Sequence, residues 1–396
     1  MSGTQRADVV VIGGAIVGSA VATFLALRPD WTGRVVVIER DPTYRTSSTT
    51  LSAASIRQQF STPLNIQISR FGISLIKDLG RWLGIPGEPT PEIDFVEGGY
   101  LFLATPAGLP VLEANHAVQR GHDVDVALLG PMELRQRFPW MTVDGIAAGS
   151  LGLSDEGWFD AHALLQAFRR KARALGIEYL AGEVTRVDRD DSAVRGVTLA
   201  DSRRIAAPHV VNAAGPRAAE VAAMAGLELP VRPRKRLVYH FDCRALQGPA
   251  PLTINPDGVY FRPEGPSWIA GFSPRDGEVD PDTLDLEVDR AAFEDRVWPA
   301  LARRAEAFES LRLLDAWAGH YEVNTLDHNA VIGPHPQLAG FLFANGFSGH
   351  GLQQAPAVGR GLAELIASGR YETLDLSPLG YGRIVRGDPL LERCVI

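Results

Sequence analysis

The chain has 396 residues and 45% hydrophobic content, enough for a large core and about two to three domains by length. Its net charge of −8 gives no general electrostatic reason to bind nucleic acid. No apolar run reaches the roughly 20 residues of a transmembrane helix, and Met1–Ala7 is too short for a signal peptide. Cys243 and Cys394 lie far apart without metal-ligand spacing. We therefore expect a cytoplasmic protein with no disulfide and no metal.

The first expected unit is a strand, a glycine turn, a helix and a second strand that ends in an acid. The apolar run Val9–Ile12 is typical of a buried parallel strand. Gly13 would permit the tight turn, and Gly18 would let the helix pack closely on the sheet. The helix N-terminus offers N–H groups to a pyrophosphate. Glu39 follows Gly18 by 21 residues, where a carboxylate can bind an adenosine ribose. This pattern predicts a dinucleotide site.

Two details refine that prediction. Ala15 occupies the middle glycine position of the usual G-x-G-x-x-G pattern, and Gly14 stands one place earlier. An acid at the ribose disfavours a 2′-phosphate, which argues against NADP. The alternative is a strand–helix–strand unit whose glycines serve packing alone.

Further elements follow along the chain. The small hydroxyl residues of Thr46–Ser55 suit a loop at phosphates or a ring system, or else an ordinary surface loop. Helical spacing is present over Asn65–Leu83, and a strand pair is expected over Phe95–Leu103. Other expected elements are helices at Leu109–Arg120, Pro131–Phe138, Asp160–Leu175, Arg217–Ala225 and Arg290–Phe308, and strands at Glu183–Val187, Val194–Leu199 and His209–Gly215.

From Pro230 onward, short strands separated by Pro and Gly turns predict an antiparallel sheet. The last part of the chain returns to the first pattern. A buried strand ends at Gly346, a glycine turn follows to Gly351, and a helix is expected over Ala357–Ser368 with Pro356 in its first turn. A nicotinamide cofactor needs one such glycine turn. A flavin can use two, because a helix N-terminus stabilises negative charge on its reduced ring.

Three segments resemble the superfamily of FAD-dependent amino-acid and amine oxidases: Val11–Gly18, Asn212–Gly215 and Gly346–Gly351. That family includes D-amino acid oxidase, glycine oxidase, monomeric sarcosine oxidase and D-arginine dehydrogenase. Longer segments resemble a branch linked to the assembly of a respiratory complex; they are Ile56–Gln67, Phe347–Pro356 and Leu374–Pro378.

The resemblance implies an α/β fold with a Rossmann-like FAD-binding domain and an α+β substrate domain built on an antiparallel sheet, as in D-amino acid oxidase. The FAD domain would comprise 1–90, 145–230 and 318–396, and the substrate domain 91–144 and 231–317. The implied FAD contacts are Gly13, Ala15, Gly18, Glu39, Arg40, Ser48, Thr49, Thr50, Leu51, Val184, Ala214, Gly215, Gly346, Gly349, His350, Gly351, Leu352 and Gln353.

Two departures from the family pattern concern the covalent bond between protein and flavin and the reaction of the enzyme with oxygen. Gly319 aligns with the cysteine that binds flavin covalently in sarcosine oxidases, and Leu51 and Ser52 stand where other members have a linking histidine. We therefore expect non-covalent FAD. Lysines beside the flavin in sarcosine oxidase, one of which promotes the reaction with oxygen, align with Ile269 and Gln353. Their replacement argues against oxygen as the electron acceptor, and the alternatives are oxygen or an unknown acceptor.

The substrate carboxylate needs a cationic partner. Arg57 is the first candidate, because a guanidinium binds a carboxylate with two hydrogen bonds; a structural ion pair is the alternative. Tyr260, Arg262 and Tyr321, the last of which aligns with a substrate-binding arginine of D-arginine dehydrogenase, are the other candidates. His350 is expected to make a backbone or flavin contact. The basic cluster Arg232–Arg236 is expected to be a solvated strand start, with a substrate or partner role for Arg236 as the alternative.

The sequence thus predicts FAD-dependent oxidation of the C–N bond of a secondary amine, such as an N-substituted glycine, followed by imine hydrolysis. A D-amino acid or glycine oxidase or dehydrogenase is one alternative. The other is an assembly factor that binds FAD without turnover.

Overall fold

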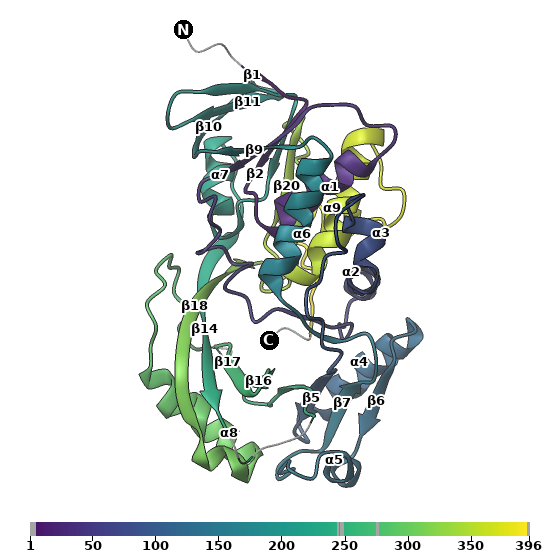
Figure 1. Cartoon of the computed structure of the whole chain (residues 1–396), viewed down its shortest axis with the longest axis vertical. Coiled ribbons are helices and arrows are strands. Elements are labelled where there is room, and N and C mark those ends of the chain that lie inside the picture. Colours follow the sequence, from purple (N-terminus) through teal and green to yellow (C-terminus); the bar gives the residue numbers. More distant parts are fainter. Residues whose placement is uncertain (1–4, 244, 246–248, 275–276, 394–396) are drawn as a thin grey trace.

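The computed structural model describes residues 5–243, 245, 249–274 and 277–393 (Figure 1). A six-stranded sheet has the order β19-β20-β13-β2-β3-β9, and all neighbours in it are parallel except β19 and β20. Its strands are β2 (Val9–Ile12), β3 (Val35–Glu39), β9 (Glu178–Ala181), β13 (His209–Asn212), β19 (Val331–Pro334) and β20 (Phe341–Asn345). Strands β2 and β20 are buried throughout, as expected of strands covered on both faces.

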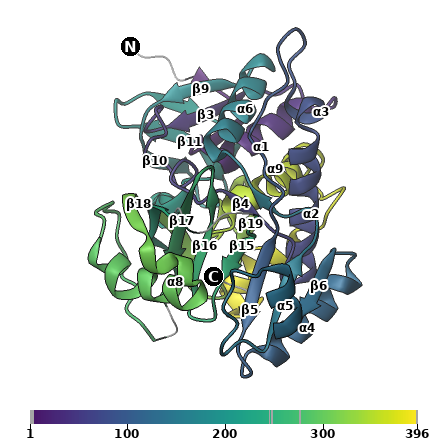
Figure 2. The same cartoon turned by 60° about the horizontal axis from the view of Figure 1, so that its bottom comes forward.

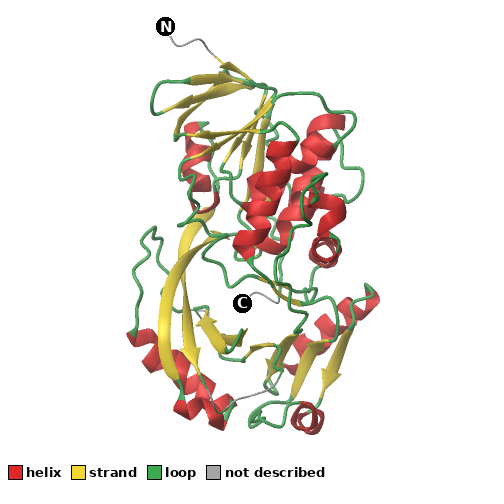
Figure 3. Ribbon diagram, viewed as in Figure 1, coloured by secondary structure: helices red, strands yellow, loops and turns green. Residues whose placement is uncertain are grey.

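Helices cover one face of this sheet and a small second sheet covers the other (Figure 3). The helices are α1 (Ile16–Leu27), α2 (Pro63–Lys77), α6 (Ala161–Ala174) and α9 (Gly351–Ser368). The second sheet contains β1 (Gln5–Arg6), β10 (Val184–Arg189), β11 (Val194–Leu199) and β12 (Arg204–Ala206), with α7 (Ala218–Met224) beside it.

An eight-stranded sheet forms the other half of the molecule, in the order β18-β14-β17-β16-β15-β5-β7-β6. Strands β14 and β18 pair along their whole length and run from the six-stranded sheet into this half (Figures 1 and 2). The strands are β5 (Tyr100–Ala104), β6 (Val126–Leu129), β7 (Ala148–Gly152), β14 (Val231–Asp242), β15 (Leu252–Ile254), β16 (Val259–Glu264), β17 (Ser267–Phe272) and β18 (Arg312–Asn324).

The remaining helices and two short strands complete the fold. One face of the eight-stranded sheet packs against η2 (Phe293–Val297), α8 (Trp298–Arg304) and η3 (Glu306–Ser310). The remaining elements are α3 (Leu79–Leu83), α4 (Leu109–Gly121), α5 (Pro131–Arg137), α10 (Gly382–Arg386), η1 (Gly215–Arg217), η4 (Ser377–Leu379), β4 (Ser55–Ile56) and β8 (Gly157–Trp158). Among the described residues, no helix is long and apolar enough to cross a membrane.

The expected fold class is confirmed, because a parallel Rossmann-like sheet is joined to a largely antiparallel one. The domain boundaries stay a prediction. Strand β7 lies in the range 145–230 expected for the FAD domain, yet it pairs with β5 and β6 in the eight-stranded sheet. Residue 318 falls inside β18. If the domains were assigned by sheet membership, the predicted boundaries at residues 145 and 318 would therefore both move.

Four local expectations are corrected. Helix α9 begins at Gly351, so Pro356 lies inside the helix, where its missing N–H leaves one carbonyl without its usual partner. The expected helix Asn65–Leu83 is split at Asp78, whose side chain caps α3. The expected strand pair reduces to β5, with Val96 making an isolated bridge to Trp158. The expected continuous helix Arg290–Phe308 is instead three short consecutive helices, η2, α8 and η3.

Candidate cofactor and substrate site

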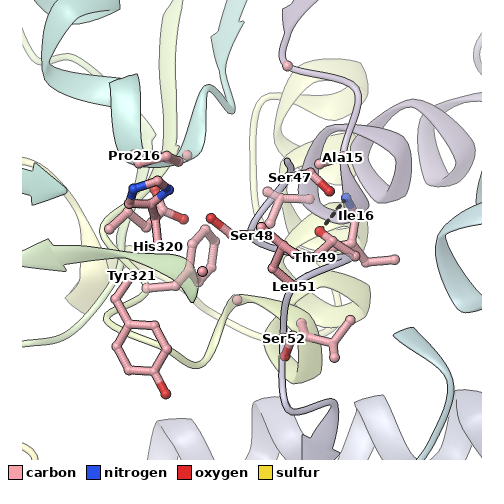
Figure 4. A pocket seen from close by; sticks show the side chains of 18 of the residues that line it. Ala15, Ile16, Ser47, Ser48, Thr49, Leu51, Ser52, Pro216, His320 and Tyr321 are labelled. Carbon is pink, nitrogen blue, oxygen red and sulfur yellow. Dashed lines mark hydrogen bonds between the residues drawn. The ribbon is translucent and has the colours of Figure 1, made fainter. Parts of the chain in front are cut away.

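A long cleft lies between the two sheets. Its walls are the carboxyl ends of β2, β3 and β13, the N-termini of α1 and α9, the loop 46–53, and the inner face of the eight-stranded sheet. The space between atoms is about 2090 Å³ when the open mouth is included, which is ample for an extended dinucleotide and a small substrate. Figure 4 shows Ser47, Ser48, Thr49, Leu51 and Ser52 beside the start of α1, with Pro216, His320 and Tyr321 across the cleft.

The turn before α1 forms the first half of a dinucleotide cradle. Gly13 has φ +99°, and a Cβ there would lie 2.3 Å from the Ala213 carbonyl oxygen. A Cβ at Gly18 would lie 1.9 Å from the Gly13 oxygen. No side chain caps α1 at its N-cap, Ala15. Its N–H groups therefore face the cleft as an anion site.

Loop 46–53 adds hydroxyl groups opposite this helix end. The Ile16 N–H donates to Thr49 Oγ1 at 3.3 Å (Figure 4). The buried Ser48 Oγ has no hydrogen-bond partner within the described chain, although it lines the cleft. A buried hydroxyl without a partner is costly, so Ser48 fits a ligand atom at this position.

Glu39 lies at the end of β3, in the cleft wall. Its Oε2 accepts from the Gly14 N–H at 2.8 Å, and its Oε1 accepts from the Asp41 N–H at 2.8 Å. A Cβ at Gly14 would lie 2.6 Å from the Tyr44 hydroxyl and 3.3 Å from Glu39 Cβ. The displaced glycine of the sequence pattern therefore allows the backbone to approach this carboxylate. Each carboxylate oxygen has a second lone pair for a ribose hydroxyl.

The turn before α9 forms the second half of the cradle. Gly346 and Gly349 have φ values of +70° and +94°, and α9 has no side-chain cap at His350. A Cβ at Gly349 would lie 2.3 Å from the Tyr321 ring. Glu322 accepts from the Gly346 N–H at 3.1 Å, and burial raises the pKa of this carboxyl to about 8. Two helix N-termini whose N-cap residues supply no side-chain cap, the orphan Ser48 hydroxyl and the glycine cradle together fit FAD.

Most of the predicted cofactor residues line the cleft: Gly13, Ala15, Glu39, Arg40, Ser48, Thr49, Leu51, Val184, Ala214, Gly215, Gly349, His350, Gly351, Leu352 and Gln353. Gly18 and Gly346 do not line the cleft. Each allows neighbouring segments to pack closely where a side chain would not fit. The Thr50 N–H and hydroxyl turn toward Ser47 instead. The FAD contacts of these three residues were implied by the family resemblance and stay a prediction.

Arg57 lies at the substrate end, 1% exposed and in the cleft wall. Its Nη1 donates to the Gln59 carbonyl at 2.7 Å, and its Nη2 lies 2.9 Å from His350 Nε2. Its guanidinium carbon is 4.4 Å from the Phe60 ring centroid. The structure therefore brings the predicted carboxylate partner to the cleft, and Glu156 and Glu392 lie near enough for their charges to interact with the Arg57 guanidinium.

Three tyrosines share this end of the cleft. Tyr100, Tyr260 and Tyr321 come from β5, β16 and β18 and all line the wall. Burial raises the pKa of each phenol, that of Tyr100 to about 12. They are therefore neutral at pH 7 and can donate hydrogen bonds. Figure 4 shows the Tyr321 ring extending into the cleft.

Arg262 is not among the cleft-lining residues. Its Nη2 donates to the Ala53 carbonyl at 2.8 Å, its Nη1 pairs with Glu264, and its guanidinium lies over Trp158. These contacts tie β16 to the loop before β4, which is a structural role. The prediction named Arg262 because it lies on a strand expected to belong to the domain that covers the flavin, a position that does not show which way the side chain points.

The basic cluster Arg232–Arg236 is not a simply solvated strand start. Arg236 lines the cleft and pairs through both Nη atoms with Asp280 at 2.8 Å. Lys235 pairs with Asp285 at 2.6 Å. An acidic segment between β17 and η2 therefore neutralises the cluster.

Sequence reasoning missed several lining residues, including Tyr100 and Glu322. Glu322 follows Tyr321 directly in β18, so its position near the site could have been inferred. Tyr100 offered no local signal, because its place in the cleft depends on β5 pairing with β15, and its partner Leu252 lies far along the chain. No group of three or more metal-ligating side chains occurs among the described residues.

Comparison with known proteins agrees with this geometry. A family model described as FAD dependent oxidoreductase matches residues 8–365. FAD-dependent oxidoreductase domain-containing protein 1 of Xenopus laevis is 43% identical over 99% of this chain and 85% of its own length. Mouse mitochondrial sarcosine dehydrogenase is 27% identical over 93% of this chain and 40% of its own length.

Among solved structures, L-proline dehydrogenase from P. horikoshii has a TM-score of 0.86 and 28% identity, covering 98% of this chain and 100% of that chain. The family match spans most of the chain and includes both glycine turns of the cleft. This chain therefore belongs to the FAD-dependent oxidoreductase family of amino-acid oxidases and dehydrogenases, and FAD is its cofactor.

Proposed function

We propose that this protein oxidises the C–N bond of a secondary amino acid, such as an N-substituted glycine or a cyclic imino acid. The observation that carries the proposal is the placement of Arg57, a buried guanidinium in the wall of a cleft that fits FAD. Two similar proteins are named for proline and sarcosine, which are both secondary amino acids. That shared chemistry favours a secondary over a primary amine here.

Arg57 would bind the substrate carboxylate. A guanidinium has five N–H donors and stays charged at all relevant pH values. The contacts of Arg57 with the Gln59 carbonyl and with His350 fix its orientation. Burial strengthens its attraction for an anion, because water screens the charge poorly there.

Tyr260 and Tyr321 would complete the carboxylate and amine contacts as neutral donors. Both phenols have raised pKa values because they are buried, so neither serves as a base at pH 7. The amine nitrogen must be uncharged for its neighbouring carbon to give up hydride. The cationic Arg57 would favour the neutral amine, since an ammonium group beside it is repelled.

When bound, FAD supplies the two-electron acceptor for the hydride from the carbon next to nitrogen. The substrate also loses the N–H proton and becomes an imine. Water converts an acyclic imine formed at the α-carbon to an amine and an oxo acid, and it opens a cyclic imine to one molecule with an amine and a carbonyl group. The role of the protein is to hold carboxylate and amine so that this carbon meets the ring. Ile269 and Gln353 stand at the lysine positions of oxygen-reactive relatives, so we infer a slow reaction with oxygen.

An anaerobic screen tests the proposal. Flavin absorbance is followed while matched pairs are added: N-methylglycine and glycine, L-proline and D-alanine. Faster bleaching by the secondary amine of each pair supports the proposal. Faster bleaching by glycine or D-alanine would favour a D-amino acid or glycine oxidase or dehydrogenase. No bleaching by any amine, with FAD bound, would favour a structural role for FAD in an assembly factor.

A further inference from the structure

The first turn of α9 contacts Arg57 at two points. The Arg57 backbone N–H donates to Gln353 Oε1 at 3.0 Å, and Arg57 Nη2 lies 2.9 Å from His350 Nε2. Gln353 Oε1 also accepts from Ser69 Oγ on α2 at 3.1 Å. The helix whose N-terminus forms part of the FAD cradle therefore also holds both ends of the arginine.

The chemistry of the His350 contact is fixed by its partner. A guanidinium is a donor only, so His350 Nε2 must accept, and the ring proton must lie on Nδ1. Burial and the Arg57 charge lower the pKa of His350 to about 3. His350 is therefore a neutral acceptor at physiological pH and not an acid–base group.

Phe60 holds the pair in place. The Arg57 guanidinium lies over its ring, and the His350 ring meets it edge-on, with centroids 5.2 Å apart and an interplanar angle of 75°. Phe60 is fully buried and His350 is 9% exposed. Neither partner can turn without opening this packing.

We propose that His350 is a positioning residue that aims the Arg57 guanidinium at the substrate carboxylate and ties that site to the FAD-binding end of α9. The inference rests on the proposed function of Arg57. Because binding coupling is reciprocal, a carboxylate ligand should also strengthen FAD binding through this contact.

The test compares two variants of similar size. His350→Gln can place an acceptor near the position of Nε2, whereas His350→Leu cannot accept. His116→Gln on the surface of α4 is the matched control. The probes are cyclopentanecarboxylate and cyclopentanecarboxamide, which lack an oxidisable amine. Their affinities are measured from shifts in bound-flavin absorbance, and the FAD dissociation constant is measured with and without the carboxylate.

We expect His350→Leu to weaken carboxylate binding by about tenfold or more, the loss of one hydrogen bond to a charged group. Carboxamide binding should stay unchanged, and His350→Gln should recover most of the carboxylate affinity. The carboxylate should tighten FAD binding in the wild type and less so in His350→Leu.

Equal losses for both probes, no loss in His350→Leu, or no rescue by Gln would overturn the inference. If His350→Leu does not retain FAD, His350→Asn takes its place, since its shorter side chain does not reach Arg57. If wild-type protein itself binds the carboxylate no better than the carboxamide, the proposed role of Arg57 fails instead.

Discussion

The cofactor half of the cleft is made from backbone amides and glycines of two strand-to-helix turns, whereas the substrate half is made from long side chains. In the cofactor half, Gly13 and Gly349 allow neighbouring segments to approach the turns closely. The substrate half contains Tyr100, Tyr260 and Tyr321, which come from three strands of the eight-stranded sheet, and Arg57, which comes from the loop after β4.

Because of this difference, the two halves of the cleft should tolerate different kinds of substitution. A backbone cradle fails when a side chain is added, because the added atoms clash with fixed main chain. A side-chain cluster fails when a group is removed and its buried partner is left without a contact. Cofactor binding and substrate binding should therefore respond to different kinds of substitution.

The largest expected effect is complete release of the flavin on denaturation. Trp317 Nε1 donates to the Leu51 carbonyl at 3.0 Å, and a Cβ at Gly319 would lie 3.1 Å from this carbonyl oxygen. Neither the cysteine nor the histidine that links flavin in relatives is present there. Acid precipitation should leave a yellow supernatant and a colourless pellet; flavin retained on the pellet would show a covalent bond.

Gly13→Ala should come next and act on the cofactor half alone. The added methyl would meet the Ala213 carbonyl at 2.3 Å in a left-handed backbone conformation, a strain of about 1–3 kcal/mol or more. The flavin-to-protein absorbance ratio after dialysis should fall to near zero. Gly145→Ala, in open space and also left-handed, is the control for general destabilisation. Full flavin content in Gly13→Ala would refute the cradle.

Arg57→Ala should act mainly on the substrate half, with an effect on FAD binding only through the His350 contact. Loss of a buried charge partner costs roughly 2–5 kcal/mol, which should appear as weaker substrate binding and slower flavin reduction in fully flavinylated protein. Arg57→Lys should restore part of the activity, because an ammonium lacks the planar fork. Unchanged reduction by the best substrate would move the carboxylate site to Tyr260 and Tyr321.

Glu39→Gln should weaken FAD binding by about 1–3 kcal/mol, the range for hydrogen bonds to a charged group. The amide keeps one acceptor oxygen where Glu39 now serves the Gly14 and Asp41 N–H groups and would serve the ribose. Fluorescence titration of FAD-depleted protein measures the change. Asp41→Asn is the matched acid control, and equal effects of the two variants would deny Glu39 a specific role.

The smallest effect concerns pH. Burial raises the pKa of Glu322 to about 8 and that of Glu156 to about 7. Between the usual carboxyl pKa and these values, the folded state holds protons that the unfolded chain has lost. Stability should therefore fall as pH rises from about 5 to 8. Melting temperatures across this range should flatten in Glu322→Gln; an unchanged slope would mean that Glu322 is ionised when folded.

The sequence predicted the cofactor half well because a strand, a glycine turn and an acid are local and follow one another in the chain. Val9–Ile12, Gly13 and Glu39 could be interpreted without knowing any distant contact. The substrate half required pairings such as β5 with β15 and β14 with β18. The partners of Arg262 and Arg236 come from other segments, so no sequence pattern could decide whether these arginines were already paired.

The most direct test of the account is the rate of anaerobic flavin reduction by a secondary amino acid and by its carboxamide. The two differ in the anion that Arg57 is proposed to bind, and the carboxamide also has a less basic amine, which on its own would favour its oxidation. In the wild type, N-methylglycine should reduce the flavin at least about tenfold more efficiently than its carboxamide, and this preference should disappear in flavinylated Arg57→Ala. Equal reduction by both compounds, or a preference that persists in Arg57→Ala, would contradict the account.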